Sequence, residues 1–332
     1  MTQVTAEEIL PGIYRIPVPL SGNPLKELNS YCIRGERNLL VDTGFRTEEC
    51  RTAVEEGLQS VGISMENTDI LLTHLHADHS GSAPDLIRPG NRVYLSRTDI
   101  AYMKRGQLAA GGHELHQLQK ERLLRHGISR SLADEMMETT PSRKLAGRAG
   151  FSDYTPLDEG DVLEAGEYRL KAISTPGHTP GHMCFSVVGT GAMITGDHVL
   201  FDISPNITNW ADVEDSLGDY LKSLDKIDQY TVTVPLPGHR KPGDFHQRIR
   251  ELKEHHRVRL EECQNVIKGL GKACLYDIAG GMSWRIRAAD WDSFPAAQRW
   301  FALGECLAHI DHLVLEGRVR RVETSGGIYY EA

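Results

Sequence analysis

The sequence predicts a mixed α/β fold that carries a helical insertion and ends in a small C-terminal domain. Short apolar or alternating segments typical of strands are interleaved with helical patterns before residue 98, and they return after residue 150. Between about 98 and 150, Lys, Arg, Glu, Gln and Leu dominate with helical spacing, which indicates the insertion. A second break in composition falls near Pro242. Because single cores rarely grow beyond about 250–300 residues, we expect two units, at 1–245 and 246–332.

The first unit begins with strands. Residues 12–18 alternate apolar and polar side chains, as a strand with one buried face does. The same reasoning predicts further strands at 29–33, 38–42, 70–73 and 93–95, and helices at 47–58 and 83–87.

Helical spacing recurs inside the insertion, at 114–126 and 131–138. Three histidines of this segment stand among charged residues, and we expect them to be solvated: His113, His116 and His126. After the insertion, apolar runs predict strands at 169–174, 183–187, 192–195 and 231–235.

The second unit combines helices with a hairpin. Long helices are expected at 245–269 and 296–316, with a short segment at 275–279 between them. Residues 319–322 and 327–330 then predict two strands joined by a glycine-containing turn. Helices followed by such a hairpin suggest a winged-helix-like domain.

Composition narrows the class of protein. The formal net charge of −9 argues mildly against a nucleic-acid partner. No apolar run has the length of a membrane helix, and the acidic N-terminus is unlike a signal peptide. The 6 cysteines form no CxxC pair, so we expect reduced thiols in a cytoplasmic protein. Any metal should therefore be held by histidine and carboxylate.

The central motif directly follows the strand predicted at 70–73. It places His74, His76, Asp78 and His79 within six positions. In an extended chain, positions i and i+2 point the same way, so the first two histidines can grip one ion. Asp78 and His79 lie where the chain turns into a helix and can reach a second ion. Imidazole and carboxylate ligands suit zinc, iron or manganese.

Three later residues repeat one pattern. His178, Asp197 and His239 each lie shortly after a predicted strand, and each is preceded by glycine. Glycine allows a sharp turn and a close approach of the backbone. Side chains from several strand ends can then converge on one edge of a sheet.

These motifs, together with Asp42-Thr43-Gly44 upstream, resemble the metallo-β-lactamase superfamily over residues from about 9 to 245. The resemblance implies an αββα sandwich of two mixed sheets with helices outside. It also implies that two metal ions are bound by seven residues. His74, His76 and His178 would hold the first ion, Asp78, His79 and His239 the second, and Asp197 would bridge both. The intact set is similar to the glyoxalase II and ribonuclease Z side of the superfamily.

Two divalent ions about 3.5–4 Å apart lower the pKa of a shared water and produce a hydroxide nucleophile. We expect zinc, with iron or manganese as alternatives, and we expect Asp78 and Asp197 to take part in catalysis. By resemblance, Asp42 orients a ligand histidine; its alternative role is a plain turn residue. His198 either contacts substrate or shuttles a proton, or it packs behind the ligands. Asn206 lies where the family's substrate loop runs and is a candidate substrate contact.

The resemblance to glyoxalase II-like enzymes favours a small-molecule thioester or other activated ester as the substrate, of the acyl-CoA or acyl-glutathione type. The insertion at 98–150 could form a lid over the metal edge and shape an acyl channel, because such insertions often set specificity on a fixed scaffold. An equally simple role for the insertion is dimerisation.

The alternative is a metal-dependent endoribonuclease acting on single-stranded RNA, since the C-terminal unit resembles the tail of the β-lactamase-like endoribonucleases. Arg318, Arg320 and Arg321 form a basic cluster there. However, residues 251–332 hold 11 Lys plus Arg against 12 Asp plus Glu, a net charge of −1. A nucleic-acid reader should be more basic. We therefore expect the tail to pack or to dimerise, and we expect a homodimer.

Overall fold

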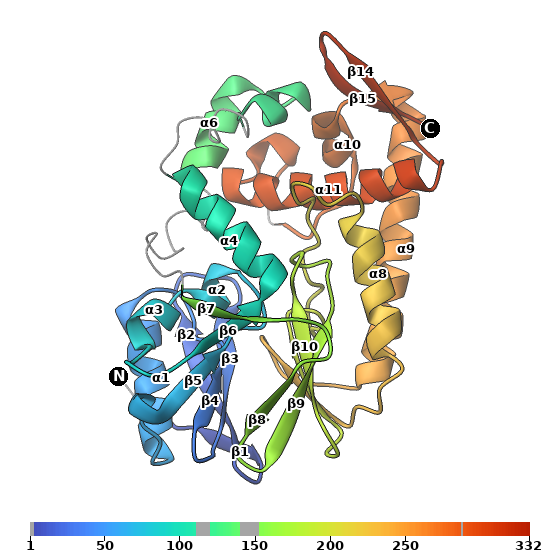
Figure 1. The fold of residues 1–332 in the computed structure, drawn as a ribbon. Helices are drawn as coiled ribbons and strands as arrows, with labels where there is room; N and C mark the ends of the chain where they lie inside the picture. Colours follow the sequence, from blue (N-terminus) through green and yellow to red (C-terminus); the bar gives the residue numbers. More distant parts are fainter. Residues whose placement is uncertain (1–2, 111–119, 140–152, 287) are drawn as a thin grey trace.

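The computed structural model describes residues 3–110, 120–139, 153–286 and 288–332. Two mixed sheets lie face to face with helices on their outer sides, which confirms the αββα sandwich (Figure 1). Apolar side chains fill the space between the sheets, including Val41 and Leu71 from one sheet and Phe185 and Ile194 from the other. Burial of these faces drives the two sheets together.

The first sheet has the strand order β1 to β7, which is also the order in the sequence. Its strands are β1 (Glu7–Leu10), β2 (Ile13–Leu20), β3 (Lys26–Ile33), β4 (Asn38–Val41), β5 (Thr68–Leu71), β6 (Val93–Ser96) and β7 (Tyr154–Leu157). The first three neighbouring pairs are antiparallel, and those from β4 to β7 are parallel. The carboxyl ends of the parallel strands therefore meet at one edge. The outer helices on this side are α1 (Glu48–Ser60), α2 (Ala77–Ser80) and α3 (Ala83–Leu86), with a 3-10 turn at η1 (Met65–Asn67).

The second sheet has the order β12-β11-β10-β9-β8. Its strands are β8 (Val162–Ala165), β9 (Tyr168–Ser174), β10 (Met183–Val187), β11 (Ala192–Gly196) and β12 (Val234–Pro237), and α8 (Ser216–Ile227) covers it. The strand predicted at 231–235 begins only at Val234. The amides of Thr233 and Val234 both bind the carbonyl of Gly191, at 2.9 and 3.1 Å, where the chain enters the sheet.

The insertion leaves the first sheet after β6 and is helical where it is described. It contains α4 (Arg97–Ala110), a helical segment at 120–125 and α6 (Arg130–Thr139). Residues 114–119 of the predicted helix, with His116, and His113 before them lie outside the described residues. The prediction that His126 is solvated is wrong, because its exposure is only 4% and its ring stacks on that of Tyr330. Burial lowers the pKa of His126 to about 4.

We call the part of the chain that follows β12 the C-terminal part. Its elements are α9 (Phe245–Leu270), β13 (Lys272–Ala273), α10 (Leu275–Gly281), η2 (Trp291–Ser293), α11 (Ala296–Leu315), β14 (Arg320–Thr324) and β15 (Gly327–Glu331). The short segment at 275–279 is thus helical, and the hairpin gains a third strand, β13.

The C-terminal helices do not form a separate core. Ile249 of α9 and Leu303 of α11 belong to the same apolar cluster as Met193 of the second sheet and Met136 of the insertion. Figure 1 shows α11 lying across one end of the sandwich, with α9 running along its side. The end of the sandwich that carries the strand-terminal loops is therefore covered by C-terminal residues.

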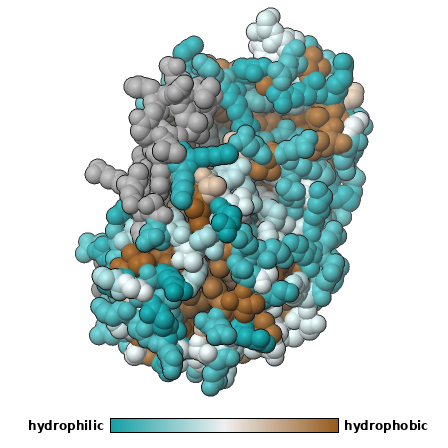
Figure 2. Space-filling model, viewed as in Figure 1, coloured by the Kyte–Doolittle hydropathy of each residue, from teal (hydrophilic) through white to brown (hydrophobic). Residues whose placement is uncertain are grey.

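The surface seen in Figure 2 is mostly hydrophilic, with apolar patches in its lower half and at its upper right. Each helix of the described segments is too short or too polar to cross a bilayer. All 6 cysteines are free, and five of them are buried.

Candidate metal centre

The seven predicted ligand residues meet at one edge of the sandwich. His74, His76, Asp78 and His79 follow β5 in the first sheet. The other three come from loops that follow strands β9, β11 and β12 of the second sheet: His178, Asp197 and His239. The edge thus collects side chains from four places in the sequence.

The backbone must come unusually close to make this convergence possible. Gly196, just before Asp197, has φ = +47°, and an added Cβ there would lie 2.7 Å from the His182 ring. At Gly238 an added Cβ would lie 2.6 Å from Oδ1 of Asp197. Real Cβ atoms are not found at such distances, so glycine is required at both positions.

A first group consists of three histidine nitrogens. Nδ1 of His76 lies 3.1 Å from Nε2 of His74 and 2.9 Å from Nε2 of His178. All three atoms lie within 4.8 Å of one another. Three imidazole nitrogens around one point are a suitable set for one side of a metal ion.

A second group lies beside the first. Nε2 of His239 lies 3.2 Å from Nε2 of His79 and 3.4 Å from Oδ2 of Asp78. Burial favours the neutral acid, but the contact with His239 and the charges of His79 and His239 together lower the pKa of Asp78 to about 2. The Asp78 side chain is 15% exposed, so this carboxylate is on the open side of the centre.

Asp197 lies between the two groups. Its Oδ1 is 3.4 Å from Nε2 of His79, and its Oδ2 is 3.7 Å from Nε2 of His178 and 3.6 Å from Nε2 of His239. Burial favours the neutral acid, but the charges of His239 and His79 hold the pKa of Asp197 well below its usual range. One carboxylate is therefore shared by both groups.

Hydrogen bonds made by the nitrogens that face away from the centre fix the tautomers of His178 and His239. Nδ1–H of His178 donates to the carbonyl of Asn206 at 2.9 Å, and Nδ1–H of His239 donates to that of Glu27 at 2.7 Å. Since a neutral imidazole carries one N–H, each Nε2 presents a lone pair toward the centre. Such outer partners orient ligands at metal sites.

Asp42 orients the ring of His79 and, through Thr73, the ring of His74. Its Oδ2 accepts from Nδ1–H of His79 at 2.7 Å and from the Thr73 hydroxyl at 2.8 Å. The Thr73 oxygen is in turn free to accept from Nδ1–H of His74 at 3.0 Å. Asp42 is buried and has φ = +59°, a conformation that aspartate tolerates better than most residues.

Burial and charge divide the histidines into two classes. Burial lowers the pKa of His76 to about 3 and that of His74 well below its ordinary value. Burial also opposes charge on His79 and His239, but the surrounding carboxylates together outweigh it and raise the pKa of both, Asp197 with Asp42 at His79 and Asp197 with Asp78 at His239. Protons therefore occupy part of the centre when no cation does, and binding of a metal would displace them.

The donor set fits divalent metal ions. Nε2 of His74 and Nε2 of His178 both present lone pairs to Nδ1 of His76, so a single N–H on His76 could satisfy only one of them, whereas a cation would satisfy all three nitrogens. Oδ1 of Asp197 is buried and has no hydrogen-bond partner among the described residues. A buried acceptor without a donor is costly, and a bound cation would satisfy it.

His198, Asn206 and His182 lie around the centre but are not among the seven predicted ligands. His198 is fully buried behind His182, with ring centroids 5.7 Å apart, and does not reach the open side. Asn206 contributes its backbone carbonyl to His178. His182 accepts from the Asp197 amide at 3.2 Å and thereby supports the loop that carries that carboxylate.

Sequence reasoning missed Asp99, at the start of α4. Its Oδ2 accepts from the amide of Leu75 and the hydroxyl of Thr179, both at 2.9 Å, and its Oδ1 accepts from the amide of Gly181 at 2.7 Å. The carboxylate thus joins the loop of His74 and His76 to the loop of His178. Burial raises the pKa of Asp99 to about 7. No motif marks it, since its partners are mainly backbone amides.

Two solved structures are similar to nearly the whole chain. A metallo-beta-lactamase family protein from Thermus thermophilus is 30% identical with a TM-score of 0.78, and the match covers 98% of this chain and 100% of that one. A beta-lactamase domain protein from Burkholderia ambifaria is 27% identical with a TM-score of 0.83, and the match covers 98% and 94% of the two chains.

Curated relatives are more distant. An atrochrysone carboxyl ACP thioesterase from Emericella nidulans is 24% identical over 75% of this chain and 64% of its own length. A lactamase-like protein, nscB, from Aspergillus fumigatus is 25% identical over 75% of this chain and 60% of its own. The chain therefore spans less than two thirds of the length of these relatives.

Family profiles match both parts of the chain. The profile of the metallo-beta-lactamase superfamily matches residues 27–239, and that of the metallo-beta-lactamase-like C-terminal domain matches residues 292–331. The first match includes all seven residues of the centre. By this match and by its likeness to the solved structures, the chain belongs to the metallo-beta-lactamase superfamily.

Proposed function

We propose that this protein is a dinuclear metal-dependent hydrolase that cleaves a thioester of a small molecule. The observation that carries the proposal is the position of Asp197, whose carboxylate lies within 3.7 Å of nitrogens from both groups, His178 of the first and His79 and His239 of the second. The ligands proposed for one ion are His74, His76 and His178, and those for the other are Asp78, His79 and His239, with Asp197 shared.

When bound, two such ions supply an acidified water and a positive charge for the oxyanion that develops on the substrate. The protein itself would hold the two ions and orient their ligands. The Asp197 carboxylate offsets repulsion between two cations. Asp78 is the more exposed of the two acids, at 15% against 7%, so we assign it the role of accepting a proton on the open side.

An aromatic wall beside the centre supports an acyl substrate. The Trp210 ring is stacked on that of His76, with centroids 5.9 Å apart, and Tyr102 meets Trp210 edge-on at 5.8 Å. These rings offer apolar surface next to the half-buried His76, where the acyl part of a thioester can pack. The thioesterase name of several fungal relatives points to the same substrate class.

The basic cluster of the C-terminal hairpin gives little support to the RNA alternative. Its arginines are paired with acids of the same region: Arg318 with Glu316, Arg320 with Glu331 and Arg321 with Glu323. Paired charges leave little net field to attract phosphates. Zinc as the metal, a winged-helix-like tail, a homodimer and a cytoplasmic location remain predictions.

Metal analysis and a substrate panel test the proposal. The purified protein should contain about two divalent ions per chain, and it should hydrolyse acyl-CoA or acyl-glutathione but not single-stranded RNA. His239→Ala should abolish hydrolysis. The matched control is His246→Ala, since His246 is a surface residue paired with Asp228, and it should retain full activity. A metal content near zero, or cleavage of RNA alone, would contradict the assignment.

A further inference from the structure

The loop between β11 and α8 holds a predicted ligand from outside. We call residues 203–212 the rim loop. Its Asn206 carbonyl accepts from Nδ1–H of His178 at 2.9 Å, and its Trp210 indole N–H donates to the His178 carbonyl at 3.1 Å. Trp210 also stacks on His76. The rim loop therefore fixes both ends of His178 and one face of His76, which are two of the three histidines in the first group.

Helix α11 of the C-terminal part holds the rim loop in turn. The amide of Asn209 donates to the carbonyl of Gly304 at 3.2 Å, and the Asn209 side chain donates to Asp311. At Gly304, an added Cβ would lie 2.2 Å from Oγ1 of Thr208. The helix therefore approaches the rim loop so closely that a single methyl group has no room.

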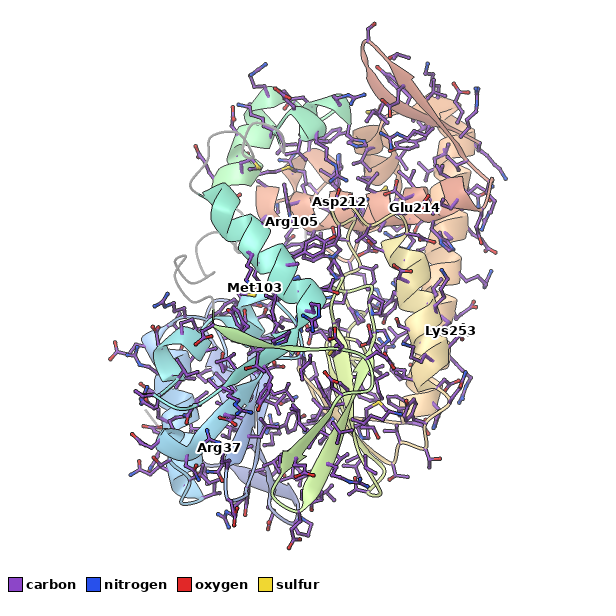
Figure 3. The ribbon with its side chains drawn as sticks, viewed as in Figure 1. Arg37, Met103, Arg105, Asp212, Glu214 and Lys253 are labelled. Carbon is purple, nitrogen blue, oxygen red and sulfur yellow. The ribbon has the colours of Figure 1, made fainter. Side chains whose placement is uncertain are left out.

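The insertion touches the rim loop from the other side. Tyr102 donates to the carbonyl of Ala211, and Arg122 donates to the Asn209 side chain. Arg105 pairs with Asp212 at 2.6 Å, and Figure 3 shows the two side chains facing each other between α4 and the rim loop. Both members of this pair are mostly exposed, so the pair contributes little stability. The contact with α11 is closer and less exposed, since Thr208, Asn209 and Gly304 are half-buried.

We infer that α11 is a positioning element of the metal centre. Gly304 and Asn209 set the rim loop at the distance from which Asn206 and Trp210 orient His178. This inference rests on the metal centre of the proposed function and extends it to the C-terminal part. The role of this part would then be to hold the geometry of the first ligand group, although the two are far apart in the sequence.

Gly304→Ala tests the inference with a minimal change. Alanine is a better helix former than glycine, so α11 itself should not suffer. The added methyl should push Thr208 and the rim loop outward. Because loss of an outer partner typically lowers metal affinity about 10–100-fold, we expect such a fall for one of the two ions. Chelator competition on the metal-loaded protein measures it, and the absorption spectrum of the Co²⁺-substituted protein reports the ligand geometry independently of activity.

A second substitution should restore the site. In the double variant Gly304→Ala, Thr208→Ala, the hydroxyl oxygen that the new methyl meets is gone, and the next atom, Cβ of residue 208, is 3.3 Å away. Metal affinity and the Co²⁺ spectrum should return close to those of the wild type. Asn209→Ala removes the link to Asp311 without adding volume and should weaken metal binding in the same direction.

The control is Gly269→Ala. Gly269 also lies in a C-terminal helix, but an added Cβ there meets open space, so metal binding should not change. Unchanged affinity in Gly304→Ala would overturn the inference, as would loss of metal that Thr208→Ala does not rescue, since the damage would then lie in α11 itself. Failure of the wild-type protein to bind two ions would instead overturn the proposed function.

Discussion

One group of buried histidines lies at the rim of the sandwich, and another lies between α9 and α11. In the second group, Nδ1 of His256 is 3.2 Å from Nε2 of His309, a separation like those in the metal centre. Nδ1–H of His309 donates to the carbonyl of Glu305 at 2.7 Å, so its Nε2 is an acceptor and His256 supplies the proton. One shared proton satisfies this contact, and no cation is needed.

Carboxylates make the difference between the two groups. At the rim, Asp197 faces three histidines, and the outward nitrogens are engaged by other acceptors. In the C-terminal pair, the carboxylate of Glu305 turns to Arg259 instead, at 3.5 Å. Closely spaced imidazoles therefore do not by themselves indicate a metal site. A metal site is indicated when the outer nitrogens of the imidazoles must carry the protons and an acid is shared between the rings.

The largest effect should follow from removing the shared charge at the rim. Asp197→Asn keeps the shape of the side chain but loses the anion between the two groups. We expect metal affinity to fall by more than the roughly 100-fold upper range seen for outer partners, with loss of hydrolysis. Metal content after dialysis measures it. The surface variant Asp225→Asn should behave as the wild type, because Asp225 is an exposed residue paired with Lys253. If Asp197→Asn kept two ions, a shared carboxylate would not be what distinguishes the rim histidines from the His256–His309 pair.

The next effect concerns the outer partners. Asp42→Asn preserves the backbone conformation, because asparagine also tolerates positive φ, but it weakens the acceptor for His79 and Thr73. Metal affinity should fall about 10–100-fold, as measured by chelator competition. An affinity equal to that of the wild type would mean that Asp42 is only a turn residue.

Lowering the pH should destabilise the folded protein through the buried pair of His256 and His309. Burial lowers the pKa of His309 to about 3 and that of His256 well below its usual value. Below about pH 6.5 the unfolded chain binds protons that the folded chain refuses, so stability is lost as pH falls. His309 alone should cost about 1.5 kcal/mol between pH 6.5 and 5, and His256 should act in the same direction. Urea unfolding of metal-free protein should show a shallower pH dependence in the double variant His256→Leu, His309→Leu. Identical slopes would argue against neutral, buried histidines.

The smallest effect is expected from the same double variant at pH 8. Replacing both partners of a buried polar contact with apolar residues of similar size is often nearly neutral, so the free energy of unfolding should change by no more than about 1 kcal/mol. Metal content should stay at the wild-type value. A drop in metal content would show that the C-terminal pair also serves the metal centre.

Much of the centre could be predicted because its chemistry is local in the sequence. His74, His76 and His79 follow one strand within six positions, and glycine precedes His178 and Asp197 after two further strands. Since strand ends gather at sheet edges, such a pattern implies convergence. Many of the strands were similarly predictable from apolar or alternating runs, which follow from burial of one or both faces, whereas their arrangement in two facing sheets was implied by the family resemblance.

Other features depend on tertiary contacts that leave no local pattern. Asp99 joins two loops through backbone amides, and any residue type could supply those amides. His126 lies among charged neighbours in the sequence, yet the hairpin covers it with Tyr330. The strand β7 is only four residues long and contains a proline, so its pairing with β6 outweighs a weak local preference.

The crowded glycines at the centre also limit how this scaffold can diversify. At Gly196 and Gly238, a methyl group would collide with a histidine ring or a carboxylate of the site itself, so these two backbone positions admit no larger residue. The aromatic wall formed by Tyr102 of α4 and Trp210 is partly exposed and consists of side chains rather than backbone. A laboratory search for variants with new acyl preferences should therefore randomise the aromatic wall and leave the two glycines unchanged.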